Sequence, residues 1–350
     1  QNKLGHSGEV LSLDAPAKMA GKLPFTVHEI GPAKGSYGYS KRLVPWLKRH
    51  RKNYDAVVAH GLWQHVGYAT RQALHGSGTP YYVFPHGMLD PWFKQAYPRK
   101  HLKKQLYWRW GEYRVLRDAR AVLFTCEEER RLARLSFKQY AANESVVGLG
   151  IAEPPDDIDA ARLAFQQAYP EIHDRALLFL GRIDPKKGLD LLIKAYRELQ
   201  EGGRELPPLV LAGPDADSTY AQELRTLLGD TPGVHFTGML KGELKWGALA
   251  QCAALVLPSH QENFGIVVAE ALALGKPVLI SDKVNIFKEV FTDGAGLVEA
   301  DTLEGTRKLL KRWLELSAHE HEMLKAMARP CYVKRFAIEQ VAERMLEVFR

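Results

Sequence analysis

The sequence predicts an α/β protein built from two doubly wound domains, each with a parallel sheet covered by helices on both faces. Short continuous apolar runs alternate with helix-length segments through the second half of the chain, and the first half repeats this alternation less regularly. Parallel strands buried on both faces are unbroken apolar runs, and helices are the connections that such strands require. At 350 residues the chain has the length of about two domains.

The first half contains four apolar runs that we expect to be strands, namely 10–13, 56–60, 81–85 and 121–125. The chain enters the first run almost at once, and this run resembles the second strand of a Rossmann unit. A first strand, its glycine turn and a helix, some ~30 residues in all, normally precede that strand. We therefore expect the first strand and helix of the N-terminal domain to be missing from this sequence.

The second half alternates more clearly between strand and helix patterns. The expected strands are 176–181, 209–213, 234–237, 254–258 and 277–281. The helix-like stretches between them are 189–199, 221–228, 243–252 and 266–274. Domains of this kind bind their ligands at the carboxyl ends of the strands.

Gly, Pro and Asp cluster in residues 148–157, which predicts the join between the domains. We expect an N-terminal domain over 1–152 and a C-terminal domain over 153–335. The remaining residues, 336–350, carry apolar side chains at helical spacing, and we expect this helix to cross back to the N-terminal domain.

The charge of the chain is unevenly distributed. Residues 1–150 hold 24 Lys and Arg against 11 Asp and Glu, whereas residues 151–350 hold 24 against 30. The basic half is expected to meet an anionic surface, either membrane lipid or nucleic acid, unless it is simply solvated. The three cysteines lie far apart, and the sequence has neither a secretion signal nor an apolar run of about 18 residues. We expect a cytoplasmic protein, peripheral on the inner face of the cytoplasmic membrane.

The segment 97–120 concentrates the basic charge, with eight Lys or Arg against two acids. Leu102, Leu106, Trp110 and Tyr113 fall on one face of the helix that this segment is expected to form. Basic side chains beside an apolar and aromatic stripe suit a helix lying on anionic lipid. An ordinary core-facing helix with a solvated basic rim fits the pattern equally well. The segment has no nucleic-acid-binding signature, so we expect no nucleic acid partner.

The most specific motif is a pair of glutamates, Glu262 and Glu270, that follows the apolar run 254–258. A helix that begins near Phe264 and Gly265 offers free N–H groups and the positive end of its dipole to a phosphate. Glycine also lets a ligand approach the backbone closely. One carboxylate can accept hydrogen bonds from a sugar and the other from a ribose diol. Glutamates facing water on an amphipathic helix are the weaker interpretation, because Glu270 lies in an apolar run where an unpaired charge is costly.

This Glu-x7-Glu motif resembles the signature of the retaining glycosyltransferases of family four. That family has the GT-B fold, in which two Rossmann-like domains face a central cleft. The segment 180–188 resembles the family's strand-to-helix turn, which implies that Arg182 and Lys187 bind the donor diphosphate. Two fixed cations beside a glycine turn suit a pyrophosphate group.

The resemblance continues through segments 210–214 and 235–240 and covers most of the second half and, more loosely, the first. It implies that Gly213 lies close to the nucleotide and that Met239 or Leu240 packs on the face of the base. The donor-binding residues that it implies are Gly181, Arg182, Lys187, Gly213, Gly238, Met239, Leu240, Asn263, Phe264, Gly265, Ile266, Val267 and Glu270.

Two histidines, His60 and His86, end strand-like runs in the first half. The resemblance implies that His86 lies in the interdomain cleft beside the transferred sugar. There a histidine can donate a hydrogen bond or stabilise a developing cation through its backbone carbonyl. We expect His86 and Glu262 to be catalytic, although a lone histidine is often a structural residue. His60 and Trp63 are candidates for acceptor binding.

The resemblance therefore implies transfer of a hexose-type sugar from a nucleoside diphosphate sugar to an acceptor hydroxyl with retention of configuration. In this fold retention is commonly explained by front-face attack, with the leaving phosphate accepting the acceptor's proton. Arg182, Lys187 and the helix dipole can replace a cation, so we expect no cofactor and no metal site. The basic first half favours a lipid-linked or saccharide acceptor and an anionic membrane surface as a partner.

Two other classes of protein remain. A nucleotide-sugar epimerase of the same fold is disfavoured by the four charged residues Arg182, Lys187, Glu262 and Glu270. A non-catalytic sugar-nucleotide-binding protein is favoured by the apparently missing first strand.

Overall fold

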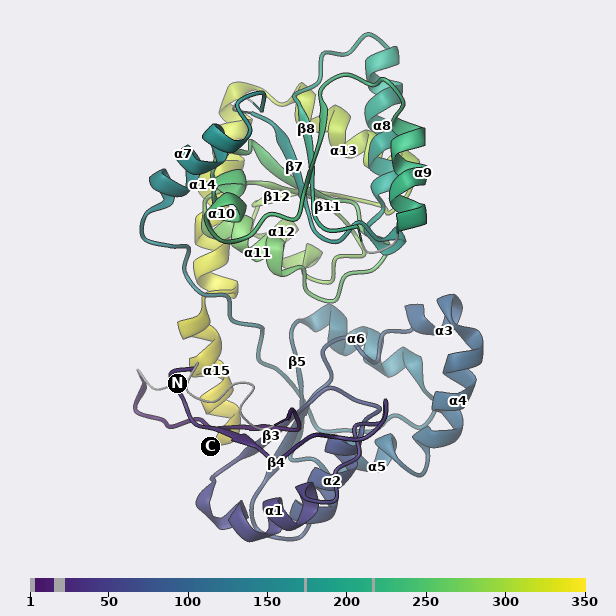
Figure 1. The fold of residues 1–350 in the computed structure, drawn as a ribbon, viewed down its shortest axis with the longest axis vertical. Coiled ribbons are helices and arrows are strands. Elements are labelled where there is room, and N and C mark those ends of the chain that lie inside the picture. The colour runs from purple at the N-terminus through teal and green to yellow at the C-terminus, as the bar shows by residue number, and fades with distance from the viewer. Residues whose placement is uncertain (1–3, 16–22, 173–174, 216–217) are drawn as a thin grey trace. The chain divides into compact units, whose positions relative to one another are not determined.

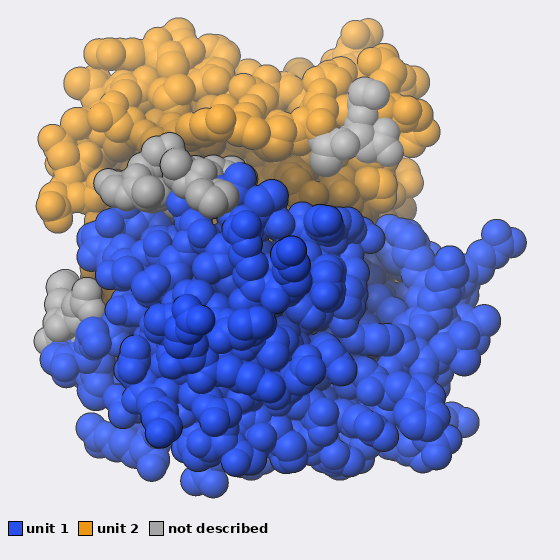
Figure 2. All heavy atoms as spheres, turned by 60° about the horizontal axis from the view of Figure 1, so that its bottom comes forward, with its two compact units in different colours: residues 1–148, 341–350 blue, residues 149–340 orange. Residues whose placement is uncertain are grey.

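The computed structural model describes residues 4–15, 23–172, 175–215 and 218–350. The chain forms two compact units, coloured separately in Figure 2. Unit 1 comprises Gln1–Gly148 together with Val341–Arg350, and unit 2 comprises Leu149–Gln340. The division therefore falls at the beginning of the Gly- and Pro-rich segment and again within the last helix.

Unit 1 contains a parallel sheet whose strand order follows the chain (Figure 1). Its strands are β3 (Val57–His60), β4 (Tyr81–Phe84), β5 (Ala121–Phe124) and β6 (Glu144–Val146). Two further strands, β1 (Val10–Ser12) and β2 (Val27–Glu29), pair in parallel and form a separate two-stranded sheet. The four apolar runs of the first half each contain a strand, whereas β2 and β6 are additional.

The central strands of unit 1 are buried on both faces, because alternate residues of a strand point to opposite sides of a sheet. Tyr81 and Val83 of β4 belong to one apolar cluster, and Tyr82 and Phe84 belong to another. The helices of unit 1 that precede the linker are α1 (Leu43–His50), α2 (His65–Leu74), α3 (Trp92–Ala96), α4 (Pro98–Trp108), α5 (Glu112–Asp118) and α6 (Glu127–Ser136). Residues of α1, α2, α4, α5 and α6 contribute to the first cluster.

Side chains of the C-terminal helix α15 (Ile338–Phe349) pack against the second cluster, on the other face of the sheet. The ring of Phe349 lies 4.7 Å from that of Tyr82, and the Tyr82 hydroxyl donates to the carbonyl of Val348 at 3.2 Å. The Arg344 guanidinium donates to the carbonyl of Val147 at 3.2 Å. The last turns of the chain thus pack against strands that lie more than half the sequence away (Figure 1).

The segment 97–120 does not form one helix. It is divided into α4 and α5 by Arg109–Gly111. Gly111 has φ −107° and ψ −94°, and a Cβ at this position would overlap the ring of Tyr107. The expected stripe is therefore broken. Tyr113 packs against the core of unit 1, whereas Leu102, Leu106 and Trp110 are exposed.

Unit 2 contains a six-stranded parallel sheet in the order β12-β11-β10-β7-β8-β9. The strands in chain order are β7 (Leu177–Leu180), β8 (Leu209–Ala212), β9 (Val234–Gly238), β10 (Ala254–Leu257), β11 (Val278–Ser281) and β12 (Gly296–Glu299). Apart from β12, each coincides with an apolar run that the sequence assigns to a strand, although β9 extends one residue further, to Gly238. This is the doubly wound order of a dinucleotide-binding domain.

Helices cover both faces of this sheet (Figure 1). They are α7 (Ile158–Ala168), α8 (Leu189–Glu201), α9 (Ser218–Leu228), α10 (Gly242–Gln251), α11 (Ile266–Ala273), α12 (Phe287–Thr292), α13 (Leu303–Glu315) and α14 (Ala318–Arg335). Helix α8 packs against both α9 and α13, and α7 packs on α10. Within the described parts of the chain, none of the helices has the length and hydropathy of a membrane span.

Candidate active site

The sheet of unit 2 has one point at which the order of its strands reverses. From β7 the chain builds outward through β8 and β9, and it then returns to the other side of β7 to build β10, β11 and β12. Helices leave in opposite directions at such a point, and doubly wound sheets bind their ligands there, outside the carboxyl ends of the two central strands. The segments that follow β7 and β10 contain Arg182, Lys187, Glu262 and Glu270.

The turns that follow β7 and β10 touch through their backbones. Gly188 has φ 65°, and a Cβ at this position would overlap the carbonyl oxygen of Pro258. The amide of His260 donates to the carbonyl of Lys186 at 2.8 Å. Glycine is required at residue 188 both for its left-handed backbone and for this close approach. The contact fixes the position of Lys187 relative to Glu262.

Lys187 and Glu262 form an ion pair between the two turns. The backbone of Glu262 is held on both sides, because its amide donates to Lys283 and its carbonyl accepts from Asn285, each at 3.0 Å. Both side chains are about one-fifth exposed, so the pair is partly desolvated yet open to a ligand. The pair holds the Lys187 ammonium in place, and a phosphate arriving here would compete with Glu262 for it.

The strands β7 and β8 approach closely at their carboxyl ends. A Cβ at Gly213 would overlap the carbonyl oxygen of Gly181, and the amide of Gly181 donates to Ala212 at 2.9 Å. Arg182 follows directly and is exposed. Its guanidinium has no recorded partner among the residues that the structure describes, so it is available to an anion.

Helix α11 begins where β10 has ended, with Gly265 as its N-cap at φ 79°. Neither the amide of Ile266 nor that of Val267 has a recorded acceptor among the described residues. Free first-turn amides and the helix dipole favour an anion at this end. Phe264 is buried, and its ring packs edge-on against Phe336 at 5.5 Å, which anchors the turn that contains Asn263.

Glu270 has a partner that sequence reasoning missed. Lys245 of α10 donates to Glu270 Oε1 at 2.7 Å, and the same ammonium group lies 4.4 Å from the centre of the Trp246 ring. The pair explains how a carboxylate is tolerated in the apolar helix α11. No local pattern could have indicated Lys245, because the two residues belong to different helices and meet only in the folded unit.

The end of β9, where the resemblance implies that the base of the nucleotide binds, differs in one respect from what the sequence predicts. Gly238 has φ 70° and its carbonyl accepts from the amide of Gly213 at 2.8 Å. Met239 is exposed, whereas the side chain of Leu240 is buried. Of the two residues expected to pack on a base, only Met239 is therefore accessible.

In unit 1, His60 and His86 meet at the carboxyl ends of β3 and β4. Nδ1 of His60 lies 2.9 Å from Nε2 of His86, so one ring donates a hydrogen bond to the other. Desolvation lowers the pKa of both rings, and the neighbouring His60 contributes to lowering the pKa of His86 to about 4. Both rings are therefore neutral near pH 7, and neither adds a full charge to the site.

Two buried glutamates hold the loops that carry these residues. Glu129 of α6 accepts from the amides of Gly87 and Thr125, and so fixes the backbone that follows His86. Glu112 of α5 accepts from the amide of Trp63, which has a left-handed φ of 68°. The sequence contains a partial signal for Glu129, since it lies three residues after the N-cap of α6. It contains none for Glu112.

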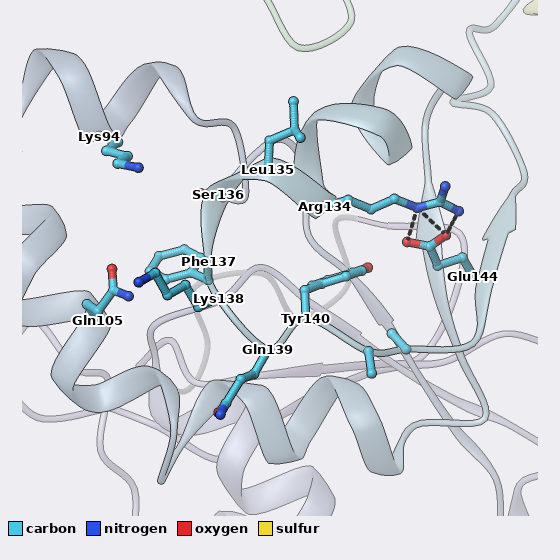
Figure 3. A pocket seen from close by; sticks show the side chains of 12 residues that line it. Lys94, Gln105, Arg134, Leu135, Ser136, Phe137, Lys138, Gln139, Tyr140 and Glu144 are labelled. Carbon is cyan, nitrogen blue, oxygen red and sulfur yellow. Dashed lines mark hydrogen bonds and ion pairs between the residues drawn. The ribbon is translucent and has the colours of Figure 1, made fainter.

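A separate cavity of about 750 Å³ lies elsewhere in unit 1, beside α3, α4 and the segment between α6 and β6 (Figure 3). Lys94 and Gln105 line one side, and the Arg134–Glu144 ion pair lines the opposite side. None of the site residues expected from the sequence lines this cavity. Over the described ranges, no cluster of three or more His, Cys, Asp or Glu side chains is arranged to hold a metal ion.

Both halves of the chain match known families. Residues 164–329 match the model described as glycosyl transferases group 1, and residues 1–150 match the glycosyl transferase 4-like domain. The chain is 32% identical over 197 residues to the phosphatidyl-myo-inositol mannosyltransferase of Mycolicibacterium smegmatis, a match that covers 53% of this chain and 49% of that protein. It is 30% identical over 203 residues to the D-inositol 3-phosphate glycosyltransferase of Nocardia farcinica, covering 54% and 43%. The chain thus spans about half the length of these curated relatives or less.

Solved structures with the same fold extend over nearly the whole chain. A glycosyltransferase from Rickettsia africae superposes with a TM-score of 0.74 at 14% identity and covers 99% of this chain and 90% of that chain. Anabaena HepE in complex with UDP and glucose superposes with a TM-score of 0.72 at 18% identity, covering 97% and 90%. At these identities the likeness concerns the fold alone.

Proposed function

Because the chain belongs to the group 1 glycosyl transferases and has their two-domain GT-B fold, we propose that it transfers a sugar from a nucleoside diphosphate sugar to an acceptor hydroxyl with retention of configuration. The observation that carries this proposal is the meeting of the Lys187–Glu262 pair and the start of α11 at the strand-order reversal of unit 2. Two cationic side chains and free helix amides suit a diphosphate leaving group, and two carboxylates suit hydroxyl-rich sugars.

The diphosphate would bind the amides of Ile266 and Val267, with Arg182 and Lys187 neutralising its charge. As the glycosidic bond breaks, negative charge grows on the phosphate, so these donors act more strongly in the transition state than in the ground state. The same phosphate would accept the proton of the acceptor hydroxyl during front-face attack. Fixed cations perform the role that a metal ion has in other transferases, so the reaction would be metal-independent.

The two glutamates would have different tasks. Glu270, held by Lys245, would accept hydrogen bonds from the ribose through Oε2. Glu262 would hold sugar hydroxyls or stabilise the oxocarbenium-like charge. The neutral His86 would donate a hydrogen bond or offer its backbone carbonyl to the transferred sugar, and His60 and Trp63 would contact the acceptor.

Two of the similar proteins support finer parts of this proposal. HepE was solved with UDP and with UDP-glucose, which favours uridine as the first base to test. The mannosyltransferase of M. smegmatis is named for phosphatidyl-myo-inositol, and the basic first half agrees with a lipid-linked acceptor. Such an acceptor would bring the chain to the inner face of the cytoplasmic membrane.

The test is thermal stabilisation by UDP, GDP and ADP, measured on the wild type, on Glu270→Ala and on Glu223→Ala. Glu223 is an exposed residue of α9 and is the matched control. A nucleotide at about 100 times its Kd adds about 2.7 kcal/mol to the free energy of unfolding. We expect one nucleotide to stabilise the wild type and the control but not Glu270→Ala. No stabilisation by any nucleotide would contradict the proposed donor site.

Turnover distinguishes the proposal from its alternatives. Incubation with the matching nucleotide sugar should release nucleoside diphosphate, and the NMR spectrum of the glycoside product should show the anomeric configuration of the donor. Binding without release or transfer would indicate a non-catalytic nucleotide-sugar-binding protein. Conversion of the donor sugar without an acceptor would indicate an epimerase.

A further inference from the structure

Helix α4 has one buried face and one face that is open to solvent. His101 and Trp108 are buried, and their rings pack against Phe137 at 4.7 Å and 4.5 Å. The opposite face presents Leu102 and Leu106, which are 64% and 70% exposed. These leucines leave apolar surface in contact with water, although the rest of the helix is well packed. Association with another surface would remove this apolar area from water.

Cations surround these leucines. At 100° per residue, Arg99, Lys103 and Arg109 lie on the same side of α4 as Leu102 and Leu106. Just beyond the helix, Trp110 is 67% exposed, with the guanidinium groups of Arg109 and Arg114 each 5.6 Å from its ring. We call the set Arg99, Leu102, Lys103, Leu106, Arg109 and Trp110 the outer face of α4.

Acidic side chains do not neutralise this face. Segment 97–120 contains two acids, and both are engaged elsewhere. Glu112 is buried beneath Trp63, and Asp118 is paired with Arg71 and Arg117. Across the part of the chain that the structure describes, no ion pair is recorded for Arg99, Lys103 or Arg109.

We propose that the outer face of α4 binds the surface of an anionic lipid bilayer. Leucines interleaved with cations fit this partner, because the leucines enter the acyl boundary while the Lys and Arg stems extend to the lipid phosphates. Trp110 is exposed just beyond the end of α4, and tryptophan favours the headgroup region of a bilayer. A nucleic acid would match the charge but would leave both leucines in water. This surface would bring the chain to the membrane that carries a lipid-linked acceptor, and only this purpose rests on the proposed function.

The experiment is cosedimentation of the full chain with vesicles at low salt. Vesicles of phosphatidylglycerol and phosphatidylcholine in equal parts are compared with vesicles of phosphatidylcholine alone. We expect the wild type to sediment with the anionic vesicles and to remain largely in solution with the neutral ones. Absence of binding, or equal binding to both kinds of vesicle, would overturn the proposal.

Two double variants separate the apolar and electrostatic contributions. Leu102→Glu with Leu106→Glu should weaken binding more than about tenfold, since two leucines no longer leave water. Arg99→Gln with Lys103→Gln should weaken it roughly fivefold for each cation removed. Leu163→Glu is the control, because Leu163 is 54% exposed on α7 of unit 2 and its replacement adds the same acidic group. An equal loss in the control, or retained binding in the leucine variant, would refute the role of this face.

Nucleotide-induced thermal stabilisation of the same variants keeps the two proposals distinguishable. All of them should keep the wild-type response to the nucleotide, which also shows that they are folded. Failure of vesicle binding with an intact nucleotide response would refute the membrane surface alone. A wild type that binds vesicles but responds to no nucleotide would leave the surface standing and contradict the donor site.

Discussion

Glu112 should make unit 1 less stable as the pH rises, which is the opposite of the usual effect of a carboxylate. The side chain is 0% exposed, and its Oε2 has no hydrogen-bond partner among the described residues. Burial raises the pKa of Glu112 from its ordinary 4.5 to about 7, although the amide of Trp63 and the charge of Lys104 partly offset this effect. The carboxyl group is therefore protonated in the folded state under conditions in which it ionises in the unfolded chain.

The size of the effect follows from this difference in pKa. One pKa unit corresponds to 1.36 kcal/mol, so a rise from 4.5 to about 7 gives a change of about 3 kcal/mol. Because the pKa of Glu112 is higher in the folded state than in the unfolded chain, its protonation contributes this free energy to the stability of unit 1. The contribution is fully present below pH 4.5 and is lost as the pH rises through about 7. The substitution Glu112→Gln keeps an oxygen that can accept from Trp63 and removes the titration. As the pH rises through this window, the free energy of unfolding of the variant should increase relative to that of the wild type by up to about 3 kcal/mol.

The assay is denaturant unfolding at a series of pH values, followed by tryptophan fluorescence. Five of the seven tryptophans lie in unit 1, so this signal chiefly reports the unit that contains Glu112. Glu127→Gln is the control, because it makes the same substitution on a side chain that is 56% exposed on α6. A stability difference between Glu112→Gln and the wild type that stays constant with pH, or that shrinks as the pH rises, would refute the reasoning.

Three further predictions concern the donor site of unit 2. Gly188→Ala should abolish nucleotide-induced stabilisation and destabilise unit 2 by more than about 1 kcal/mol, since its Cβ would strike Pro258 and its φ is 65°. Gly203→Ala is the control, because Gly203 also has a positive φ but has open space around it. An equal loss of the nucleotide response in the control would contradict the prediction. Lys245→Met should weaken nucleotide binding about tenfold or more by leaving Glu270 without its cation, measured by calorimetry, whereas unchanged affinity would show that Lys245 does not position Glu270. Activity should survive a metal chelator, and complete loss that added Mg²⁺ or Mn²⁺ restores would refute metal independence.

The fold class could be predicted because its signal is local. The central strands of both units are runs of four residues that are buried on both faces, so they appear in the sequence as unbroken apolar segments. Strands β6 and β12 lack that signal. Strand β6 contains Glu144 and Ser145 and is only partly buried, and β12 begins with glycine and ends with glutamate. Their pairing with a neighbouring strand, and not their composition, makes them strands.

The behaviour of segment 97–120 required the tertiary structure. Its composition is equally compatible with a helix that faces the core and one that faces outward. The sequence alone cannot show that the close approach of Tyr107 to Gly111 ends α4, which turns Tyr113 inward while Leu102 and Leu106 stay outside.

The sequence by itself determined the two α/β domains, the turns that follow the central strands and the residue types that gather there. The reason is that strand burial, helix periodicity and glycine turns each depend on the types of a few neighbouring residues. Only the tertiary structure decided which charges meet. Lys187 and Glu262, and likewise Lys245 and Glu270, come from separate segments, and their pairing depends on the order in which parallel strands are placed in the sheet.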